Sequence, residues 1–297
     1  MRVEPPTERF QTAVEDSDRW RHVELRPDDI IISTPPKSGT TWTQGILRSL
    51  LWPQGVAPDR LGALSPWPDV RAIPIDDMRS LMEAATQRRF FKTHSPADAV
   101  PWCDELRYVA VYRAAPDALV SWGNHRADML PAVVRLLNAD ATAHGLEPLS
   151  ETWDGDYDAL LEEWLVVCNP YTHLASWWKR RNRPNVLLLH YADMTEDLGR
   201  EMRRLADFLD IEVPVASWDS AIERSTLEAM RESARSEGTA GAFTQGPDSF
   251  FYRGGLGRGA QLLTDDQLRR VDEAGRATLD AEAHAWLEGG SASGVAV

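Results

Sequence analysis

The sequence is poor in lysine, cysteine and long apolar runs. Only three of its 32 basic residues are lysine, and only two of its 297 residues are cysteine. Cys103 and Cys168 lie in or beside apolar stretches and are too few for a metal cluster, so we expect buried thiols. No run of about 18 apolar residues could span a bilayer, and the N-terminus lacks the apolar core of a signal peptide. We therefore expect a cytoplasmic protein without stable membrane anchoring.

Positive charge is scarce overall as well. The formal net charge is −14, which argues against broad nucleic-acid binding and against docking on an anionic membrane surface. An anionic ligand must therefore be held by a locally positive pocket. The hydrophobic and charged fractions, 43% and 26%, are near the globular average, and a chain of this length can bury the core of one large domain.

Four short apolar runs, each ending in a polar turn, predict strands. They cover residues 30–33, 89–92, 108–112 and 186–190. A helical pattern follows each run, and strands that alternate with helices indicate a parallel sheet covered on both faces. The sequence thus predicts a single α/β domain with a central parallel sheet flanked by helices.

Apolar spacing also predicts particular helices. Trp42, Ile46 and Leu50 recur every four residues after the first strand, and Thr264 with Gln267 fits a capping box that opens a C-terminal helix. Further helices are expected over residues 158–179 and 198–209.

Three stretches lack such periodicity and are expected to be irregular, namely residues 1–25, 140–155 and 237–259. The expected organisation is an N-terminal extension over 1–25, one domain over 26–288 and a flexible tail over 289–297.

Two of the three lysines, Lys37 and Lys92, lie where a predicted strand ends in polar sequence. Around Lys37, a strand that stops at residues 33–36 and resumes as a helix near Thr40 directs unpaired backbone amides at one spot. Those amides, the positive helix end and the ammonium all favour an anion. The candidate anion-binding residues are Lys37, Ser38, Gly39, Thr40, Thr41 and Trp42. An ordinary capped helix N-terminus is the alternative.

This loop is P-loop-like but departs from the Walker pattern, because its lysine precedes the glycine. Its residues 36–42, PKSGTTW, are similar to the 5′-phosphosulfate loop of the cytosolic sulfotransferases, which use 3′-phosphoadenosine 5′-phosphosulfate (PAPS) as donor. Four more segments resemble that family in the expected order, at residues 91–96, 108–121, 191–194 and 225–230. The mycobacterial glycolipid sulfotransferases look nearest, because they share the Phe-Phe-x-Arg-Gly-Gly run at residues 250–255.

The resemblance implies PAPS as co-substrate, its desulfonated form PAP as product, and no metal. Arg113 and Ser121 match the positions that hold the 3′-phosphate, a role that suits a guanidinium fork beside a hydroxyl. Trp42 and Tyr191 offer flat faces for adenine, although Trp42 could equally be core. Ser225 is a weaker candidate on the adenine side.

His94 lies two residues beyond Lys92 on an extended segment, so both side chains are expected on one side. Sulfuryl transfer to a hydroxyl needs a base for the acceptor proton and positive charge near the departing oxygen. An imidazole suits the first role, and Lys37 and Lys92 suit the second. His94 is thus the predicted general base.

The C-terminal phosphate motif of the family fits less well. In an ungapped register Tyr252 takes the arginine position, Arg253 the lysine and Gly254 the first glycine, whereas a shift of one residue uses Arg253 as the arginine. Both registers stay open beside the alternative of a glycine-rich surface loop.

The acceptor is expected to be a hydroxyl of a small molecule or glycolipid, and a homodimer is a candidate assembly. Competing readings are a non-catalytic PAPS- or PAP-binding relative and a P-loop kinase, which would want a Walker glycine and a metal-binding aspartate. Five tryptophans are candidates for either an apolar wall or the core, namely Trp67, Trp122, Trp164, Trp177 and Trp178.

Overall fold

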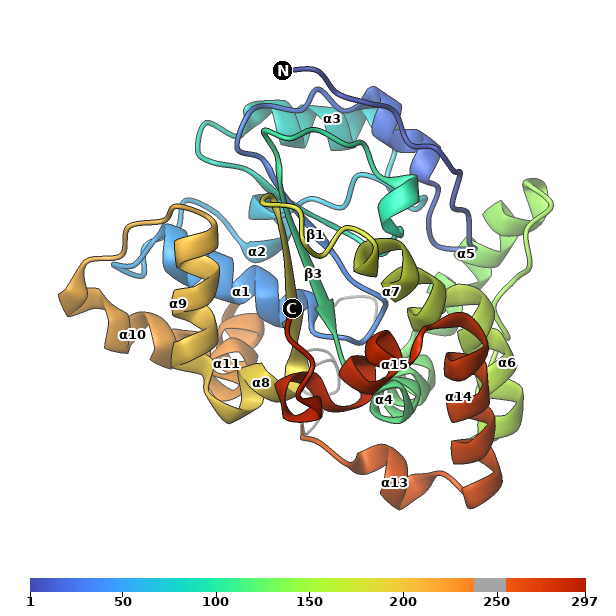
Figure 1. Cartoon of the computed structure of the whole chain (residues 1–297). Coiled ribbons are helices and arrows are strands. Elements are labelled where there is room, and N and C mark those ends of the chain that lie inside the picture. The colour runs from blue at the N-terminus through green and yellow to red at the C-terminus, as the bar shows by residue number, and fades with distance from the viewer. Residues whose placement is uncertain (238–254) are drawn as a thin grey trace.

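A four-stranded parallel sheet lies at the centre of the molecule (Figure 1). The structure is a computed structural model that describes residues 1–237 and 255–297. The strands are β1 (Ile30–Ser33), β2 (Phe90–Thr93), β3 (Arg107–Tyr112) and β4 (Val186–His190), in the order β2-β1-β3-β4. The predicted fold class is therefore confirmed, and each predicted strand lies within one residue of an observed one.

The register brings the ends of the strands to one edge of the sheet. Ser33 of β1 pairs with Thr93 of β2, and Tyr112 of β3 pairs with His190 of β4. All pairs are parallel, so the loops that follow the strands leave from the same edge. In open α/β sheets this is the edge at which ligands bind.

Helices cover both faces because strand residues alternate between two apolar clusters. Ile30 and Ile32 pack in one cluster, whereas Ile31 packs in the other. On the first face lie α1 (Thr40–Leu51), α8 (Tyr191–Glu196), α9 (Leu198–Phe208), α10 (Trp218–Arg224) and α11 (Leu227–Glu237). On the second face lie α4 (Ala115–Asp128), α6 (Tyr157–Val167), α7 (Pro170–Trp178), α14 (Asp265–Thr278) and α15 (Ala281–Gly289).

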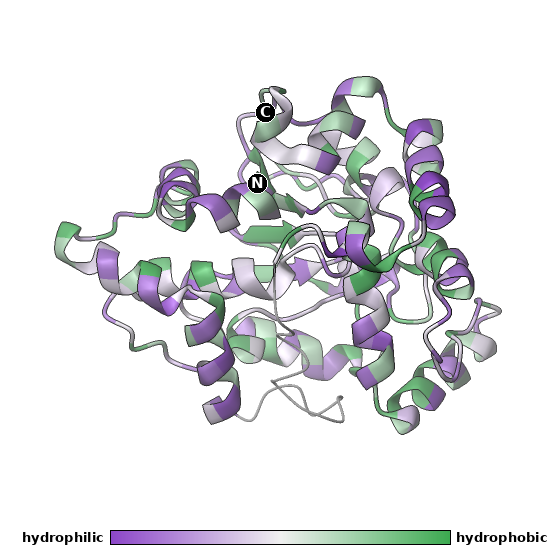
Figure 2. Cartoon of the chain, turned by 90° about the horizontal axis from the view of Figure 1, so that it is seen from below, coloured by the Kyte–Doolittle hydropathy of each residue, from purple (hydrophilic) through white to green (hydrophobic). Residues whose placement is uncertain are grey.

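The remaining elements lie around these layers. They are α2 (Leu61–Leu64), α3 (Ile75–Ala84), α5 (Pro131–Ala143), α13 (Arg258–Leu262) and the 3₁₀ helices η1 (Ser17–His22), η2 (Ala97–Ala99), η3 (Val215–Ser217) and η4 (Gly290–Ser293). Figure 2 shows hydrophobic colour on the central strands and hydrophilic colour recurring on the outer helices. Both cysteines are buried and free, as predicted.

The single helix predicted over residues 158–179 is wrong, because the chain forms α6 and α7 instead. Pro170 has no N–H to continue a helix and stands at the first position of α7. The amides of Cys168 and Asn169 both end α6 on the carbonyl of Trp164, and the Asn169 side chain caps α7 by accepting from Thr172. The other predicted helices are confirmed, including the capping box at Thr264.

Sequence periodicity also missed α5, whose last turn enters the stretch over 140–155 that was expected to be irregular. Residues 1–25 contain η1 and bury Ala13 and Trp20 against the domain. In the C-terminal segment, Ser291 of η4 donates hydrogen bonds to Asp193 through its amide and hydroxyl. The division into extension, domain and tail stays a prediction.

Candidate active site

A cavity of about 380 Å³ opens at the edge where the parallel strands end. Ten of the predicted site residues line it, namely Lys37, Gly39, Thr40, Thr41, Trp42, Lys92, His94, Arg113, Ser121 and Tyr191. They come from the loop after β1 and the start of α1, from β2 and the residue that follows it, from the residue after β3, from α4 and from the start of α8. The parallel register thus gathers residues that are far apart in the sequence.

The loop after β1 presents the first turn of α1 to this cavity. Gly39 is the N-cap residue and has no side chain to cap that turn, so the leading amides are left for another partner. Its φ of 114° favours glycine, and an added Cβ would lie 3.4 Å from the Tyr191 ring. Lys37 also has a positive φ, 69°. With these two backbone conformations, the unpaired amides at the start of α1 are available to bind an anion.

Ser38 is placed differently from its neighbours in the loop. Its amide donates to the carbonyl of Pro35, and its buried hydroxyl has no hydrogen-bond partner among the described residues. Ser38 does not line the cavity. Its predicted role as a ligand of the phosphosulfate is therefore less supported by the geometry than those of Thr40 and Thr41.

Lys37 reaches from the loop to α4, where its Nζ lies 3.3 Å from Nδ1 of His125. Burial lowers the pKa of Lys37 to about 8, and the nearby charge of Arg113 acts in the same direction. A bound anion would reverse this effect, because opposite charge favours the ammonium. The lysine is therefore suited to bind and release an anion near neutral pH.

His94 and Lys92 both contact the ring of Trp67. The Lys92 ammonium is 4.0 Å from the centre of the indole ring, and the His94 ring meets the indole edge to face at 5.0 Å. Both side chains line the cavity, as their two-residue spacing predicted. Burial lowers the pKa of Lys92 to about 8, an effect that Glu15 and Asp69 oppose.

The hydrogen bond of His94 fixes its tautomer. Nδ1 lies 2.7 Å from the carbonyl oxygen of Thr34, which can only accept, so Nδ1 carries the proton and Nε2 the lone pair. Burial, followed by the charge of Lys92, lowers the pKa of His94 to about 3. At neutral pH the ring is therefore uncharged and keeps its Nε2 lone pair, but the lowered pKa also makes it a weaker base than an exposed histidine.

Arg113 forms the far cationic wall of the cavity. One guanidinium nitrogen donates to the carbonyl of Gly255 at 2.8 Å, and the group lies 4.5 Å above the Tyr191 ring. Its Nε is buried without a hydrogen-bond partner in the described part of the chain. Asp117, one helical turn away, is 3.9 Å from the guanidinium. Arg113 therefore keeps hydrogen-bonding capacity for an anion beside Ser121.

Trp42 and Tyr191 meet edge to face, with ring centres 5.0 Å apart. The indole nitrogen of Trp42 donates to the backbone carbonyl of Ser225, and only 5% of Trp42 is exposed. The Ser225 hydroxyl donates to Ala221 instead, and Ser225 is absent from the cavity wall. Ser225 thus lies behind Trp42, which supports a positioning role over the direct adenine contact expected from the sequence.

Tyr252, Arg253 and Gly254 lie outside the described residues, so their register stays a prediction. Immediately after them, the amides of Gly257 and Gly259 donate to the carboxylate of Asp117. This contact fixes the start of α13 against α4 and places Arg258 at the cavity wall.

Among the polar residues of the cavity wall, sequence reasoning gave no role to Glu15, Asp117, Asn124, His125 and Arg258. His125 lines the cavity, whereas His190 does not and instead donates from Nε2 to the carbonyl of Leu287 in α15. Glu15 carried no signal, because it stands in a segment without apolar periodicity.

A further part of the cavity wall is largely aliphatic. It includes Val14, Val70, Ala72, Met129, Val133, Leu137, Leu149 and Val167. Two of the five candidate tryptophans, Trp67 and Trp122, line the cavity, and Trp164, Trp177 and Trp178 are core residues. The cavity therefore combines a cationic, hydroxyl-bearing part with an apolar part.

Residues 1–237 and 255–297 contain neither a candidate membrane-spanning helix nor a candidate metal site of clustered side chains. No helix there combines the length and apolar character needed to cross a bilayer. No group of three or more histidine, cysteine, aspartate or glutamate side chains there could hold a metal ion.

Comparison with known proteins agrees with these features. The sulfotransferase domain matches residues 27–282. A glycolipid sulfotransferase of Mycobacterium bovis (strain BCG / Pasteur 1173P2) is 32% identical, over 96% of this chain and 97% of the relative. Sulfotransferase 1B1 of Canis lupus familiaris is 26% identical over 73% and 71% of the two chains.

Among solved structures, the mouse sulfotransferase SULT7A1 complexed with PAP has a TM-score of 0.68, with 22% identity and 89% of each chain covered. At that identity the likeness concerns the fold. Because the domain match spans most of the chain and a full-length relative is 32% identical, the chain belongs to the sulfotransferase domain family, which confirms the resemblance and the enzyme class predicted from its motifs.

Proposed function

We propose that this sulfotransferase moves the sulfuryl group of PAPS to a hydroxyl of a small molecule or glycolipid, with His94 as general base. The observation that carries the proposal is that the anion-suited start of α1 and the uncharged His94 line the same cavity. An anion cradle alone would fit any nucleotide. A base held on the carbonyl of Thr34 beside that cradle fits transfer to a hydroxyl.

The donor needs two anion sites on either side of a base-binding surface, and the cavity offers both. The amides of α1 with Lys37, Thr40 and Thr41 suit the phosphosulfate end. Arg113, with its unpartnered Nε among the described residues, and Ser121 suit the 3′-phosphate. Tyr191 beside Trp42 provides the aromatic surface between them.

When bound, PAPS supplies the sulfuryl group that is transferred. Nε2 of His94 accepts the proton of the acceptor hydroxyl, whose oxygen forms the new bond to sulfur. The bond between sulfur and the phosphate oxygen breaks, and Lys37 and Lys92 offset the negative charge that develops on that oxygen. Burial strengthens both effects, because charges interact more strongly away from water.

The acceptor hydroxyl is proposed to enter from the aliphatic side of the cavity. The name of the M. bovis relative, a glycolipid sulfotransferase, supports an acceptor with an apolar part. Residues from α5, with Val70 and Val14, would contact that part. We place the enzyme in the cytoplasm, without stable membrane anchoring, and keep the homodimer as a candidate assembly.

The test is direct. Purified protein is incubated with PAPS and a panel of phenols, alcohols and glycolipids, and sulfated product is quantified by mass spectrometry. Thermal shift is measured in parallel with PAP and with ATP plus Mg²⁺. Product together with stabilisation by PAP supports the proposal. Stabilisation by PAP without product on the whole panel would favour the non-catalytic relative, and stabilisation by ATP plus Mg²⁺ alone would favour the kinase.

A further inference from the structure

A buried carboxyl group, Glu15, enters the cavity from a segment that the sequence left unassigned. The chain reverses there, with bridges that pair Gln11 with Asp16 and Glu15 with Val70. The amide of Glu15 also donates to the hydroxyl of Thr12. Only 3% of Glu15 is exposed, although it lines the cavity beside Lys92 and His94. Glu15 is thus held in place by its backbone.

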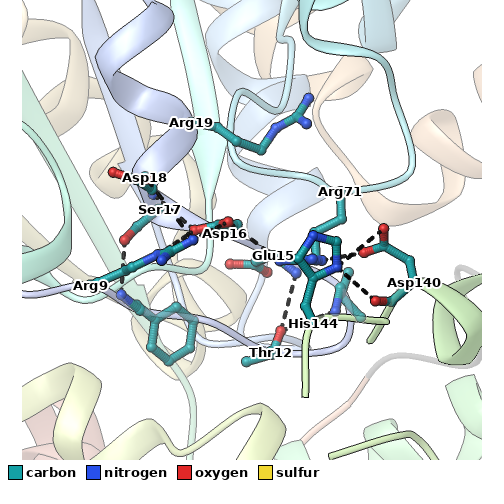
Figure 3. A network of polar contacts seen from close by, with 12 residues as sticks. Arg9, Thr12, Glu15, Asp16, Ser17, Asp18, Arg19, Arg71, Asp140 and His144 are labelled. Atoms are coloured by element: carbon teal, nitrogen blue, oxygen red, sulfur yellow. Dashed lines mark hydrogen bonds and ion pairs between the residues drawn. The ribbon is translucent and has the colours of Figure 1, made fainter. Parts of the chain in front are cut away.

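Salt bridges fix this segment against the aliphatic wall (Figure 3). Asp16 binds Arg9 at 2.8 Å and Arg71 at 3.4 Å, and Arg71 also binds Asp140 of α5 at 2.5 Å. The Arg71 side chain is itself buried. The segment that carries Glu15 and the helix that carries Val133 are therefore joined through one guanidinium.

Two buried carboxyl groups lie near Lys92, and they differ in their partners. Oδ2 of Asp69 accepts from the indole of Trp20 and from the hydroxyls of Thr93 and Ser95, which marks a structural role. Each carboxyl also has one oxygen that is buried without a hydrogen-bond partner among the described residues, Oδ1 of Asp69 and Oε2 of Glu15, but only Glu15 lines the cavity. A buried acceptor without a donor is unfavourable, so it is satisfied best by a ligand.

Burial and the nearby Asp69 raise the pKa of Glu15 well above its usual range, while Lys92 and the backbone of His94 oppose that rise. In either protonation state the carboxyl keeps an oxygen that can accept a hydrogen bond. The neutral form can also donate through its O–H, so a hydroxyl, which both donates and accepts, can meet the carboxyl in either protonation state.

We propose that Glu15 accepts a hydrogen bond from a second hydroxyl of the acceptor, so that the enzyme selects diols and sugars over matched mono-alcohols. This assignment rests on the proposed function. It follows from the position of Glu15 beside the proposed base, in the part of the cavity that adjoins the aliphatic wall. A neutral hydroxyl fits better than an ammonium, because Lys37, Lys92 and Arg113 already make the same cavity cationic.

The test compares acceptors that share one apolar group. Wild-type enzyme, Glu15→Gln and Glu15→Leu are assayed with PAPS on 3-phenoxy-1,2-propanediol, on 3-phenoxy-1-propanol and on 1-amino-3-phenoxy-2-propanol. We expect the wild type to favour the diol over the mono-alcohol by about tenfold or more in kcat/KM, the scale for a site built to bind a substrate hydroxyl. Glu15→Leu should bring that ratio close to one. Glu15→Gln, which keeps an accepting oxygen, should retain part of it.

The matched control is Glu8→Gln, the same substitution at an exposed residue of the same segment, and it should leave the ratio unchanged. The proposal would be overturned if both Glu15 variants lost kcat/KM equally for the diol and for the mono-alcohol. Equal losses would show that Glu15 acts on the rate through its neighbour Lys92 and does not contact the second hydroxyl. The proposal would also be overturned if the wild type showed a diol to mono-alcohol ratio of kcat/KM near one, or preferred the amine. In both cases the proposed sulfotransferase function would stand. Absence of transfer to every acceptor by the wild type would remove the proposed function itself, and this assignment with it.

Discussion

The two sides of the cavity are built in different ways. The side proposed to bind the donor is made of the contiguous loop after β1, the residue that follows β3 and the first turns of two helices, and it carries the cations. The acceptor side is assembled from the N-terminal segment, from residues 67–72 and from α5, and most of its residues are aliphatic. Binding of the anionic donor thus depends on backbone amides that a single turn supplies. Recognition of the apolar part of the acceptor depends instead on packing between segments that are distant in the sequence.

This difference predicts that substitutions on each side affect different steps. On the donor side and at His94, binding and catalysis depend on individual charged groups and on one proton transfer. Single substitutions there should therefore have large effects on the Kd for PAP or on kcat. On the acceptor side many weak contacts share the task, so individual variants should have small effects that concern KM for the acceptor.

The largest effect is expected for His94→Ala, at the junction of the two sides. Loss of the proposed base should lower kcat by about 10² or more, the usual scale for general-base catalysis. The affinity for PAP, measured by isothermal titration calorimetry, should stay close to that of the wild type. His22→Ala, at an exposed histidine, is the control. Near-native turnover of His94→Ala would remove this residue from the mechanism.

A smaller effect is expected for Arg113→Ala, on the donor side alone. A hydrogen bond to a charged group contributes about 1.5–3 kcal/mol, so the Kd for PAP should rise by about tenfold or more. The KM for the acceptor, measured at saturating PAPS, should change little. Arg2→Ala, at an exposed arginine, should leave both constants unchanged. An unchanged Kd in Arg113→Ala would place the 3′-phosphate elsewhere.

The affinity for PAP should also fall as pH rises. The free protein holds Lys37 and Lys92 with pKa values of about 8 each, lowered by burial, so both are increasingly neutral above that pH. A dianionic phosphate favours the ammonium, so binding above that pH requires proton uptake and weakens by up to about tenfold per pH unit for each lysine.

Calorimetry from about pH 7 to about pH 9.5, in buffers of different ionisation enthalpy, measures both affinity and proton uptake. The Lys37→Met variant should bind more weakly and show a shallower slope. A flat profile in the wild type would contradict the assignment of these lysines to the donor side.

The smallest effect is expected for Asp140→Ala, which removes one partner of Arg71 on the acceptor side. Asp140 is partly exposed, so the ion pair contributes at most about 1 kcal/mol, and a rise of a few fold in the KM for the acceptor is expected. The Kd for PAP should not change. Asp207→Ala, at an exposed residue of α9 on the other face of the sheet, is the control. If Asp140→Ala changed the Kd for PAP more than the KM for the acceptor, the two sides of the cavity would not act separately.

Much of the donor side could be predicted because its signals are local. The positions of Lys37 and Gly39 between a strand and a helix, and the two-residue spacing of Lys92 and His94, hold whatever the rest of the chain does. Ser38 and Ser225 each match a motif, yet neither lines the cavity, and the hydroxyl of Ser225 donates to Ala221 instead, so their roles stay predictions.

The break at Pro170 was overlooked although the proline is visible in the sequence, because apolar spacing continues on both sides of it. α5 was missed for a different reason, since its buried residues pack on the N-terminal segment and not on the sheet. Such a satellite cluster leaves a weaker pattern than a helix on the main core.

The sequence by itself indicated the parallel sheet, because each strand is a short apolar run and helical patterns alternate with these runs along the chain. It also indicated the anion-binding turn and the pairing of a lysine with a histidine, because each of these depends on residues within a few positions of one another. Only the tertiary structure decided that Glu15 meets Lys92, that Arg258 joins Arg113, and that α5 completes the aliphatic wall. Those contacts require chain reversals over tens of residues, and their geometry depends on packing and on buried charge, which no local spacing encodes.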